Sequence, residues 1–301
     1  MIGIVDVGGG LRDSFGCGIL EACFEKNIRF DYAIGVSAGA SNLVRFVAGQ
    51  PKSTLPFYTD YPSRREYMGA SRYVRTRSFV NYRYIFEEIS GETGENPFAY
   101  KAFQASPTKV HIVATDADSG EPAYFEKDQM RENDYRVLAA SACLPGMNRP
   151  IVYDHHRYFD GGISDPIPYK KAMQEGCERM IVILTRPRDE YREDRKDRIQ
   201  SRLIQRRYPK AAEVFRMRAM RYNQALDELK ELEKEGSALI LAPRSIEGMK
   251  TLSFHQEAIL HLYHEGKEQV EKIENFFKSA GIESIGGECE RRRKPDVRST
   301  V

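Results

Sequence analysis

Short apolar runs alternate with stretches of helical periodicity along the first half of the chain. Runs of strand length occupy residues 2–7, 32–37, 109–117, 124–127, 157–159, 179–187 and 237–245. The segments 14–27 and 38–49, which follow the first two runs, carry apolar residues at helical spacing. Two strands joined by a helix form a βαβ unit with parallel strands. The order therefore predicts a three-layer α/β/α fold with a mainly parallel central sheet and a helical C-terminal extension.

The middle and the end of the chain have different patterns. Residues 51–108 are irregular and rich in arginine and tyrosine, and a connection of that length predicts a cap over one edge of the sheet. After residue 187 the chain becomes charged and helical, with a helix after Pro209 and one or two amphipathic helices over 253–281. We expect an α/β domain at 1–187, a mostly helical extension with one strand at 188–284, and a disordered basic tail at 285–301.

Composition excludes several classes of protein. A chain of 301 residues with 41% hydrophobic residues can bury a large core, and a net charge of +2 gives no reason to expect a nucleic-acid partner. No apolar run has the roughly 18–20 residues of a membrane span. The first residues do not have the pattern of a signal peptide. The scattered cysteines predict reduced thiols in a cytoplasmic protein, without a disulfide framework or a metal site (Cys17, Cys23, Cys143, Cys177 and Cys289).

The segment GVSAG, Gly35–Gly39, follows the second apolar run and matches the pattern G-x-S-x-G. This pattern is typical of a sharp strand-to-helix turn that exposes a serine oxygen, where Gly35 and Gly39 avoid a backbone clash. The N-terminus of the following helix would then face Ser37 with free N–H groups. A tight turn of small residues is the other interpretation of the same five letters.

A glycine triplet, Gly8–Gly10, follows the first apolar run and precedes a helix. Consecutive glycines leave backbone N–H groups unobstructed, which suits an anion site or an oxyanion hole. A dinucleotide-binding loop would need glycine where Asp13 stands, and a P-loop would need GK[ST], which is absent. Because neighbouring parallel strands end at one edge of a sheet, we expect the triplet and Ser37 to face each other.

A serine nucleophile needs a base, and the sequence offers a carboxylate more readily than a histidine. Asp160 ends a short strand and precedes Gly161 and Gly162, so its carboxylate would stand in a tight loop; a hairpin turn is the alternative. His155 and His156 lie in a turn beside it, and three later histidines lie on an amphipathic helix at spacings that suit packing. A histidine triad of the α/β-hydrolase type is therefore less favoured.

Taken together, these segments resemble the patatin-like phospholipase family. The resemblance rests on GGGxR after the first strand, G-x-S-x-G after the second and a later D-G-G, in that order over about residues 2–187. Two intermediate segments agree: VATDADSGEPAYF resembles the family's strand–turn–strand, and AASACLPGMNRP resembles its A-S-x-x-x-P segment. The region after residue 187 is similar to a bacterial patatin-like subgroup with a helical C-terminal extension.

The resemblance implies a dyad of Ser37 and Asp160 without histidine, in which Ser37 attacks an acyl carbonyl and Asp160 serves as base. Backbone N–H groups of Gly8–Gly10, joined by that of Ala38, would form the oxyanion hole. Arg12 matches the motif arginine and is expected to order the loop. No metal or organic cofactor is implied.

Asp13 departs from the family's pattern, which usually has glycine after the motif arginine. A carboxylate at a helix N-terminus is favourable for the helix dipole. Near an oxyanion hole, however, its charge would oppose the negative charge that develops in the reaction.

The resemblance implies a serine lipid acyl hydrolase acting on a phospholipid, a lysophospholipid or a similar ester. Two other hypotheses stay open: a non-catalytic lipid- or acyl-binding protein with a degenerate oxyanion loop, and an acyltransferase or esterase acting on a non-phospholipid ester. Residues 56–86 interleave arginine with aromatic residues. They form either a surface for peripheral contact with the anionic inner membrane surface or an ordinary cap whose aromatic residues pack inward.

Overall fold

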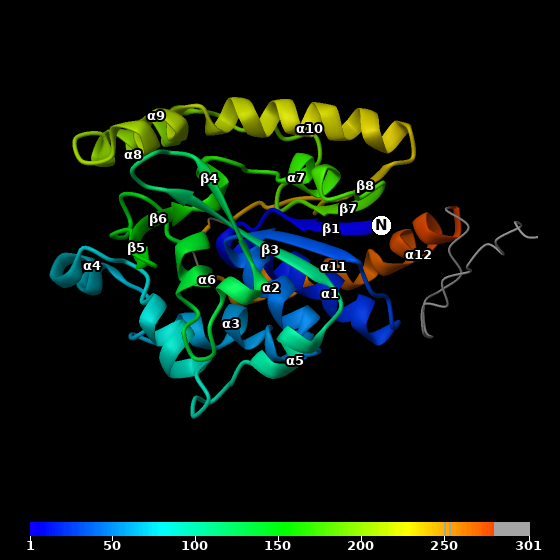
Figure 1. The fold of residues 1–301 in the computed structure, drawn as a ribbon, viewed down its shortest axis with the longest axis horizontal. Coiled ribbons are helices and arrows are strands. Elements are labelled where there is room, and N and C mark those ends of the chain that lie inside the picture. Colours follow the sequence, from blue (N-terminus) through cyan, green and yellow to red (C-terminus); the bar gives the residue numbers. More distant parts are fainter. Residues whose placement is uncertain (250, 253, 280–301) are drawn as a thin grey trace, which may run out of the picture.

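The computed structural model describes residues 1–249, 251–252 and 254–279, and one mixed sheet lies between layers of helices (Figure 1). The described strands are β1 (Ile2–Asp6), β2 (Tyr32–Val36), β3 (Lys109–Asp116), β4 (Pro122–Glu126), β5 (Ile151–Tyr153), β6 (His156–Asp160), β7 (Arg179–Ile183) and β8 (Ala238–Leu241). They are ordered β5-β6-β3-β2-β1-β7-β8, with β4 also paired to β3. Strands β3, β2, β1, β7 and β8 are parallel, whereas β4, β5 and β6 are antiparallel to their neighbours. The predicted α/β fold is confirmed.

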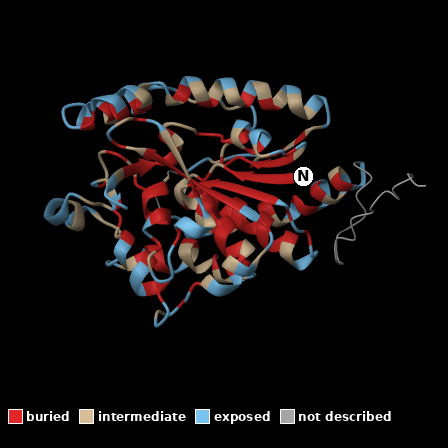
Figure 2. Cartoon of the chain, viewed as in Figure 1, coloured by how far each residue is buried: buried red, intermediate tan, exposed pale blue. Residues whose placement is uncertain are grey.

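Each face of the sheet carries its own hydrophobic core (Figure 2). Successive residues of β1 alternate between the two cores, with Ile4 in one and Val5 in the other, because side chains along a strand point to opposite faces. The first core is covered by α1 (Ser14–Glu25), α2 (Ala38–Val47) and α11 (Gln256–Glu268). The second core is covered by α7 (Tyr169–Gln174) and α10 (Arg218–Lys234).

The predicted cap over residues 51–108 consists of short helical segments. They are α3 (Pro56–Thr59), α4 (Ala70–Thr76), a π-helical segment (Tyr84–Ile89) and α5 (Tyr100–Ala105). Helix α4 stands out from the body of the molecule and has no buried residue (Figure 1). An isolated β-bridge between Met68 and Val80 closes the base of this projection.

The region after residue 187 adds helices and one edge strand. The helices α8 (Arg195–Ile204) and α9 (Pro209–Arg216) lead into α10, and α12 (Val270–Ser279) follows α11. Helix α9 begins at Pro209 as predicted, since proline suits the first position of a helix. Strand β8 lies beside β7, so the predicted boundary at residue 187 falls between neighbouring strands of one sheet and stays a prediction.

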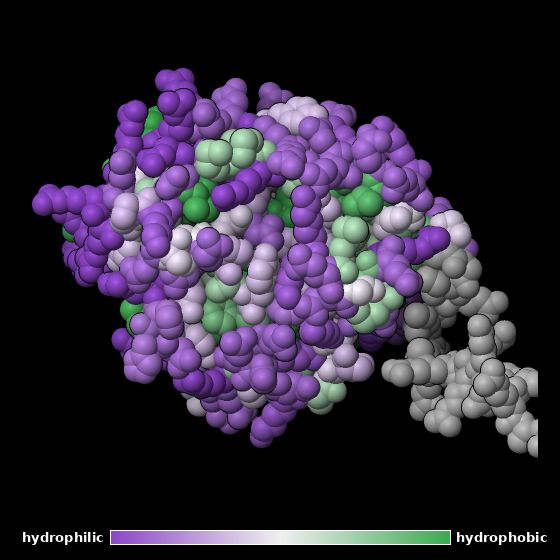
Figure 3. Space-filling view, turned by 45° about the horizontal axis from the view of Figure 1, so that its top comes forward, coloured by the Kyte–Doolittle hydropathy of each residue, from purple (hydrophilic) through white to green (hydrophobic). Residues whose placement is uncertain are grey.

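Two predictions about the C-terminus, the helix end at Gly281 and the tail at 285–301, lie outside the described residues. Within the described part of the chain, no helix combines the length and the apolar character needed to cross a membrane. Hydrophilic residues cover most of the face shown in Figure 3, and hydrophobic residues form small separate areas on it.

Candidate active site

Ser37 stands at the turn between β2 and α2 in a strained backbone conformation. Its φ of 57° and ψ of −124° lie in a region that residues with a side chain rarely adopt. Gly35 permits the turn, because a Cβ atom there would lie 2.5 Å from the Cα atom of Ala40. The sharp turn predicted from G-x-S-x-G is therefore present in the structure.

A buried hydroxyl group holds this turn from behind. The Ser37 N–H donates to Ser141 Oγ at 2.8 Å, and Ser141 Oγ donates to the carbonyl oxygen of Val113 at 2.6 Å. Ser141 is the last residue of α6 (Arg136–Ser141) and is fully buried. The strained serine is thus fixed to β3 through a side chain more than one hundred residues away.

The glycine loop packs directly against the serine turn, as expected from the parallel strands. Gly8 has a φ of 64°, and a Cβ atom there would lie 2.1 Å from the Val36 carbonyl oxygen and 3.2 Å from the Ala38 nitrogen. Only glycine allows this approach. Thr185 Oγ1 donates to the Gly8 carbonyl oxygen and anchors the loop on its other side.

The backbone N–H groups of the loop are not equivalent. The Gly8 N–H donates to Asp6 Oδ1 at 3.1 Å, so it is already engaged. Within the described part of the chain, the Gly9 N–H has no acceptor, and Gly10 opens a 3-10 turn, where the first N–H has no partner inside the helix. Gly9 and Gly10 therefore keep N–H groups that are available to a ligand, and their role in an oxyanion hole stays a prediction.

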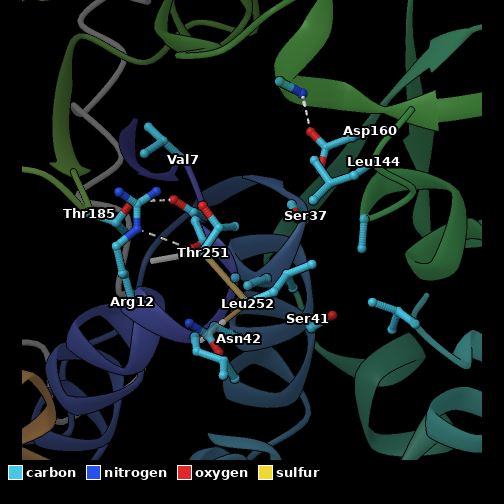
Figure 4. A pocket seen from close by; sticks show the side chains of 18 of the residues that line it. Val7, Arg12, Ser37, Ser41, Asn42, Leu144, Asp160, Thr185, Thr251 and Leu252 are labelled. Carbon is cyan, nitrogen blue, oxygen red and sulfur yellow. Dashed lines mark hydrogen bonds between the residues drawn. The ribbon is translucent and has the colours of Figure 1, made fainter. Parts of the chain in front are cut away.

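Asp160 ends β6 and points into the same cavity as Ser37 (Figure 4). Its Oδ1 accepts a hydrogen bond from the Gly162 N–H at 2.8 Å. Burial raises the pKa of this carboxyl group, while the charge of Arg218, the hydrogen bond from the Gly162 N–H and the nearby Ser37 side chain lower the same pKa. Both side chains of the predicted dyad therefore line one cavity, and the dyad itself stays a prediction.

A cavity of about 730 Å³ opens in front of these residues. Of the predicted site residues, those that line it are Gly8, Gly9, Gly10, Arg12, Ser37, Ala38, Asp160 and Gly162, while Gly35, Gly39 and Gly161 pack behind. The cap supplies aromatic lining, namely Phe57, Tyr58, Tyr67, Tyr82 and Phe86. These aromatic side chains pack inward, as the second interpretation of residues 56–86 expects.

Among the described residues, this site contains neither a histidine nor a cluster of side chains that could hold a metal ion. None of the six histidines, all of which lie in the described residues, lines the cavity. His111 is buried elsewhere, with its Nδ1 bonded to the Tyr32 hydroxyl at 2.9 Å. No cluster of three or more His, Cys, Asp or Glu that could hold a metal ion occurs within residues 1–249, 251–252 and 254–279.

The unexpected Asp13 turns away from the cavity. Its Oδ2 accepts from Asn42 Nδ2 at 3.1 Å, and Asn42 Oδ1 accepts from the Tyr58 hydroxyl at 2.7 Å. Its carboxyl group lies beside that of Asp6, and burial together with the charge of Asp6 raises the pKa of Asp13. A neutral carboxyl group in the core does not oppose charge at the oxyanion site.

Arg12 is buried beside the glycine loop (Figure 4). Its Nε donates to the Gly9 carbonyl oxygen at a long 3.4 Å, a contact that fits the predicted loop-ordering role. Its guanidinium group also faces the cavity.

Comparison with protein families decides the affiliation of the chain. The family model described as patatin-like phospholipase matches residues 7–173, which is more than half of the chain. The chain belongs to the patatin-like phospholipase family. The matched region contains Ser37, Asp160 and the glycine loop. A second model, a domain of unknown function (DUF6363), matches residues 208–279 of this patatin-like chain.

This patatin-like chain is similar to two further proteins, one by sequence and one by structure. It is 30% identical over 192 residues to the uncharacterized protein YjjU of Escherichia coli (strain K12), which covers 63% of this chain and 53% of the relative. The chain thus spans about half the length of that curated relative. The crystal structure of VipD from Legionella pneumophila superimposes with a TM-score of 0.50 and 14% identity, over 92% of this chain and 66% of that one. At that identity the likeness concerns the fold alone.

Sequence reasoning missed the residues that support the patatin-like site from behind. Asp6 carried a signal, because a carboxylate at the end of a fully buried strand needs a partner. Ser141 lies in a run of small residues, and nothing in that run indicates a contact with Ser37. Thr185 carried no signal, since its role depends on β7 lying next to β1.

Proposed function

We propose that this protein is a serine lipid acyl hydrolase that cleaves carboxylic esters of a phospholipid, a lysophospholipid or a similar lipid. The observation that carries the proposal is the strained Ser37, which shares one cavity with the buried carboxyl group of Asp160 and the unengaged amides of the glycine loop. Membership of the patatin-like phospholipase family supports the same chemistry.

In the acylation step, Ser37 Oγ attacks the acyl carbonyl carbon and its proton passes to Asp160. The N–H groups of Gly9, Gly10 and Ala38 donate to the oxyanion that forms, and the N-terminal end of α2 adds a favourable dipole. The tetrahedral intermediate collapses, the ester C–O bond breaks, and Asp160 returns the proton to the leaving alkoxide oxygen. An acyl group then remains on Ser37.

In the deacylation step, Asp160 takes a proton from a water molecule that attacks the acyl carbonyl. Collapse of the second intermediate releases the free fatty acid, and the proton on Asp160 returns to Ser37 Oγ. A carboxylate is a weak base for a hydroxyl group, so burial of Asp160 contributes by raising its pKa. The aromatic and aliphatic lining of the cavity suits the acyl chain.

Reaction with a fluorophosphonate probe tests the nucleophile. The probe is expected to label the wild-type protein and not Ser37→Ala, which should also lower kcat for a short-chain ester at least about 10³-fold. Ser41→Ala is the matched control, because Ser41 lines the same cavity one helical turn later and should still allow labelling. Equal labelling of wild type and Ser37→Ala would refute the assignment. A wild type that binds lipid without labelling or turnover would favour the non-catalytic binding protein.

We also propose a cytoplasmic protein that makes peripheral contact with an anionic membrane surface through α4. This helix exposes Val74 and Arg75, and Arg77 is exposed directly after it. The helix lies between Met68 and Val80, which line the cavity. Cations near an apolar side chain suit lipid headgroups. Cosedimentation with phosphatidylglycerol vesicles should exceed that with phosphatidylcholine vesicles, and Arg75→Glu with Arg77→Glu should abolish the difference. Equal binding to both vesicle types would contradict this proposal.

A further inference from the structure

One end of the cavity is lined by four residues that we call the arginine–tyrosine cluster: Arg12, Arg186, Arg192 and Tyr222. Arg12 follows the glycine loop, Arg186 and Arg192 follow β7, and Tyr222 lies on α10. Three of the four therefore lie outside residues 7–173, the part matched by the patatin-like family model. The dyad chemistry proposed above does not use any of them.

Tyr222 lies at the centre of the cluster with an unused hydroxyl group. Its side chain is 3% exposed, and its hydroxyl oxygen has no hydrogen-bond partner among the described residues. The Arg192 guanidinium carbon lies 5.4 Å from the centre of the Tyr222 ring. Burial raises the pKa of Tyr222, and the charges of Arg192, Arg186 and Arg12 lower it, so all three guanidinium groups act on this hydroxyl.

The arginines of the cluster also keep unused donors. The Nε atoms of Arg186 and Arg192 are buried without a partner among the described residues. A buried donor left without a partner is costly, so a ligand that accepts from these two groups would be stabilised here. Arg45, which also lines the cavity, differs because its guanidinium group has partners within the protein. It donates to Ser53, Ser90 and Asn96.

The carboxylates of the cavity wall do not neutralise all of its cations. Besides Arg45, the described cations of the cavity wall are Arg12, Arg186, Arg192, Lys196 and Arg218, and the described carboxylates are Asp160, Glu190, Glu193 and Asp197. Glu190 pairs with Arg186, and Asp197 pairs with Arg218 and lies 3.9 Å from Arg192. Five cations against four carboxylates leave one positive charge. Burial, together with the neighbouring guanidinium groups, lowers the pKa of Arg192 to about 9. An anionic ligand would relieve this repulsion.

The donor set fits a phosphate group best. Guanidinium groups bind phosphate oxygens through two parallel hydrogen bonds, and a phenol hydroxyl adds a further donor. The cluster begins at Arg12, which contacts Gly9 of the oxyanion loop, so a bound phosphate would lie close to the ester under attack. A phosphate that is part of the acyl ester substrate satisfies both the chemistry and the position.

We propose that the arginine–tyrosine cluster binds the phosphate group of the substrate, so that the enzyme selects acyl esters that carry a phosphate over the same esters without one. This inference rests on the proposed function, because it names the substrate of that site. The selectivity comes from residues contributed by the region after β7.

Steady-state kinetics on matched substrates tests the proposal. An acylglycerol 3-phosphate should be hydrolysed with a kcat/KM at least about tenfold above that of the monoacylglycerol with the same acyl chain. Tyr222→Phe, which removes only the unpartnered hydroxyl and keeps all charges, should remove most of this preference. Arg192→Gln should also remove most of the preference for the ester that carries a phosphate. Arg195→Gln, an exposed arginine on α8 outside the cavity, is the control with the same charge change.

Several outcomes would overturn the proposal. Equal kcat/KM values for the two acylglycerols would do so, and so would a loss in Tyr222→Phe that is the same with and without phosphate. If the wild type hydrolyses no ester, the proposed function fails, and calorimetric binding to Ser37→Ala tests the cluster by itself. Acylglycerol 3-phosphate should then bind at least about tenfold more tightly than inorganic phosphate. Equal binding would assign a free-phosphate site instead, and absence of binding would reject the anion site.

Discussion

The carboxyl groups of Asp6 and Asp13 lie side by side in the core, directly behind the glycine loop. Asp6 Oδ2 and Asp13 Oδ1 have no hydrogen-bond partner among the described residues. Both atoms lie within 2.7 Å of the position that a Cβ atom on Gly16 would take. Because two adjacent buried carboxylates repel each other strongly, the pair retains a proton at neutral pH. Asp6 Oδ1 in turn accepts from the Gly8 N–H and holds the loop.

This pair predicts a stability that falls as pH rises. Burial raises both pKa values in the folded protein, so the folded state binds more protons than the unfolded chain. The contribution to stability is therefore complete below about pH 4, the range of an unfolded aspartate, and is lost as pH rises through the folded pKa values. Asp13→Asn keeps the hydrogen bonds without the proton, and should stabilise the protein by on the order of 1–3 kcal/mol at about pH 8 relative to wild type.

Urea denaturation at about pH 5 and about pH 8 measures this effect. The exposed Asp128→Asn is the control and should follow the wild-type profile. Parallel pH profiles for wild type and Asp13→Asn would show that the pair does not retain its proton.

Asp160→Asn tests the base of the proposed dyad. The substitution keeps the size of the side chain and the acceptor for the Gly162 N–H, but it removes the proton acceptor. We expect kcat for a short-chain ester to fall about 10³-fold or more with little change in melting temperature. Asp165→Asn is a matched control, since Asp165 also has a pKa raised by burial but does not line the cavity. Full activity of Asp160→Asn would require another base.

The pH dependence of kcat/KM should report Asp160. Activity is expected to fall on acidification as this carboxylate takes up a proton, with a midpoint above the roughly 3.9 of an ordinary aspartate, because burial raises its pKa. The charge of Arg218 is the largest opposing effect on this pKa. Arg218→Gln should therefore move the midpoint upward, and Arg218→Lys, which keeps the charge beside Asp197, should not. A midpoint that is identical in all three proteins would exclude Asp160 as the titrating group.

Ser141→Ala tests the support of the serine turn. It removes the acceptor for the Ser37 N–H and should lower the free energy of unfolding by about 1–3 kcal/mol. A turn that is no longer held in its strained form should also lower kcat more than it raises KM. The half-buried Ser164→Ala, which leaves the contacts of Ser37 intact, should affect kcat much less. Unchanged kcat in Ser141→Ala would mean that the turn keeps its form without this bond.

Much of the fold could be read from local patterns. The apolar runs at residues 2–7 and 32–37 and the helical periodicity behind them required a parallel sheet, because each helix must return the chain to the same edge. Ser37 and the glycine triplet were therefore expected at one edge without knowledge of a single contact. Strand β5 and the short cap helices escaped prediction, since their few residues carry too little periodicity to distinguish them from loops.

The sequence by itself determined the order of the chemical groups: a glycine loop, a serine turn and a later aspartate, each at the end of a strand. Tertiary structure alone decided how those groups are supported. Asp13 looked like a charge facing the reaction, yet packing turns it into the core beside Asp6, where burial favours its neutral form. Arg186 looked like part of an apolar strand, and Arg192 and Tyr222 looked like parts of a charged helical region. Only the placement of β7 and α10 brings the three residues to the cavity. Long-range packing made these decisions, because burial and neighbouring charges depend on the whole fold and not on sequence spacing.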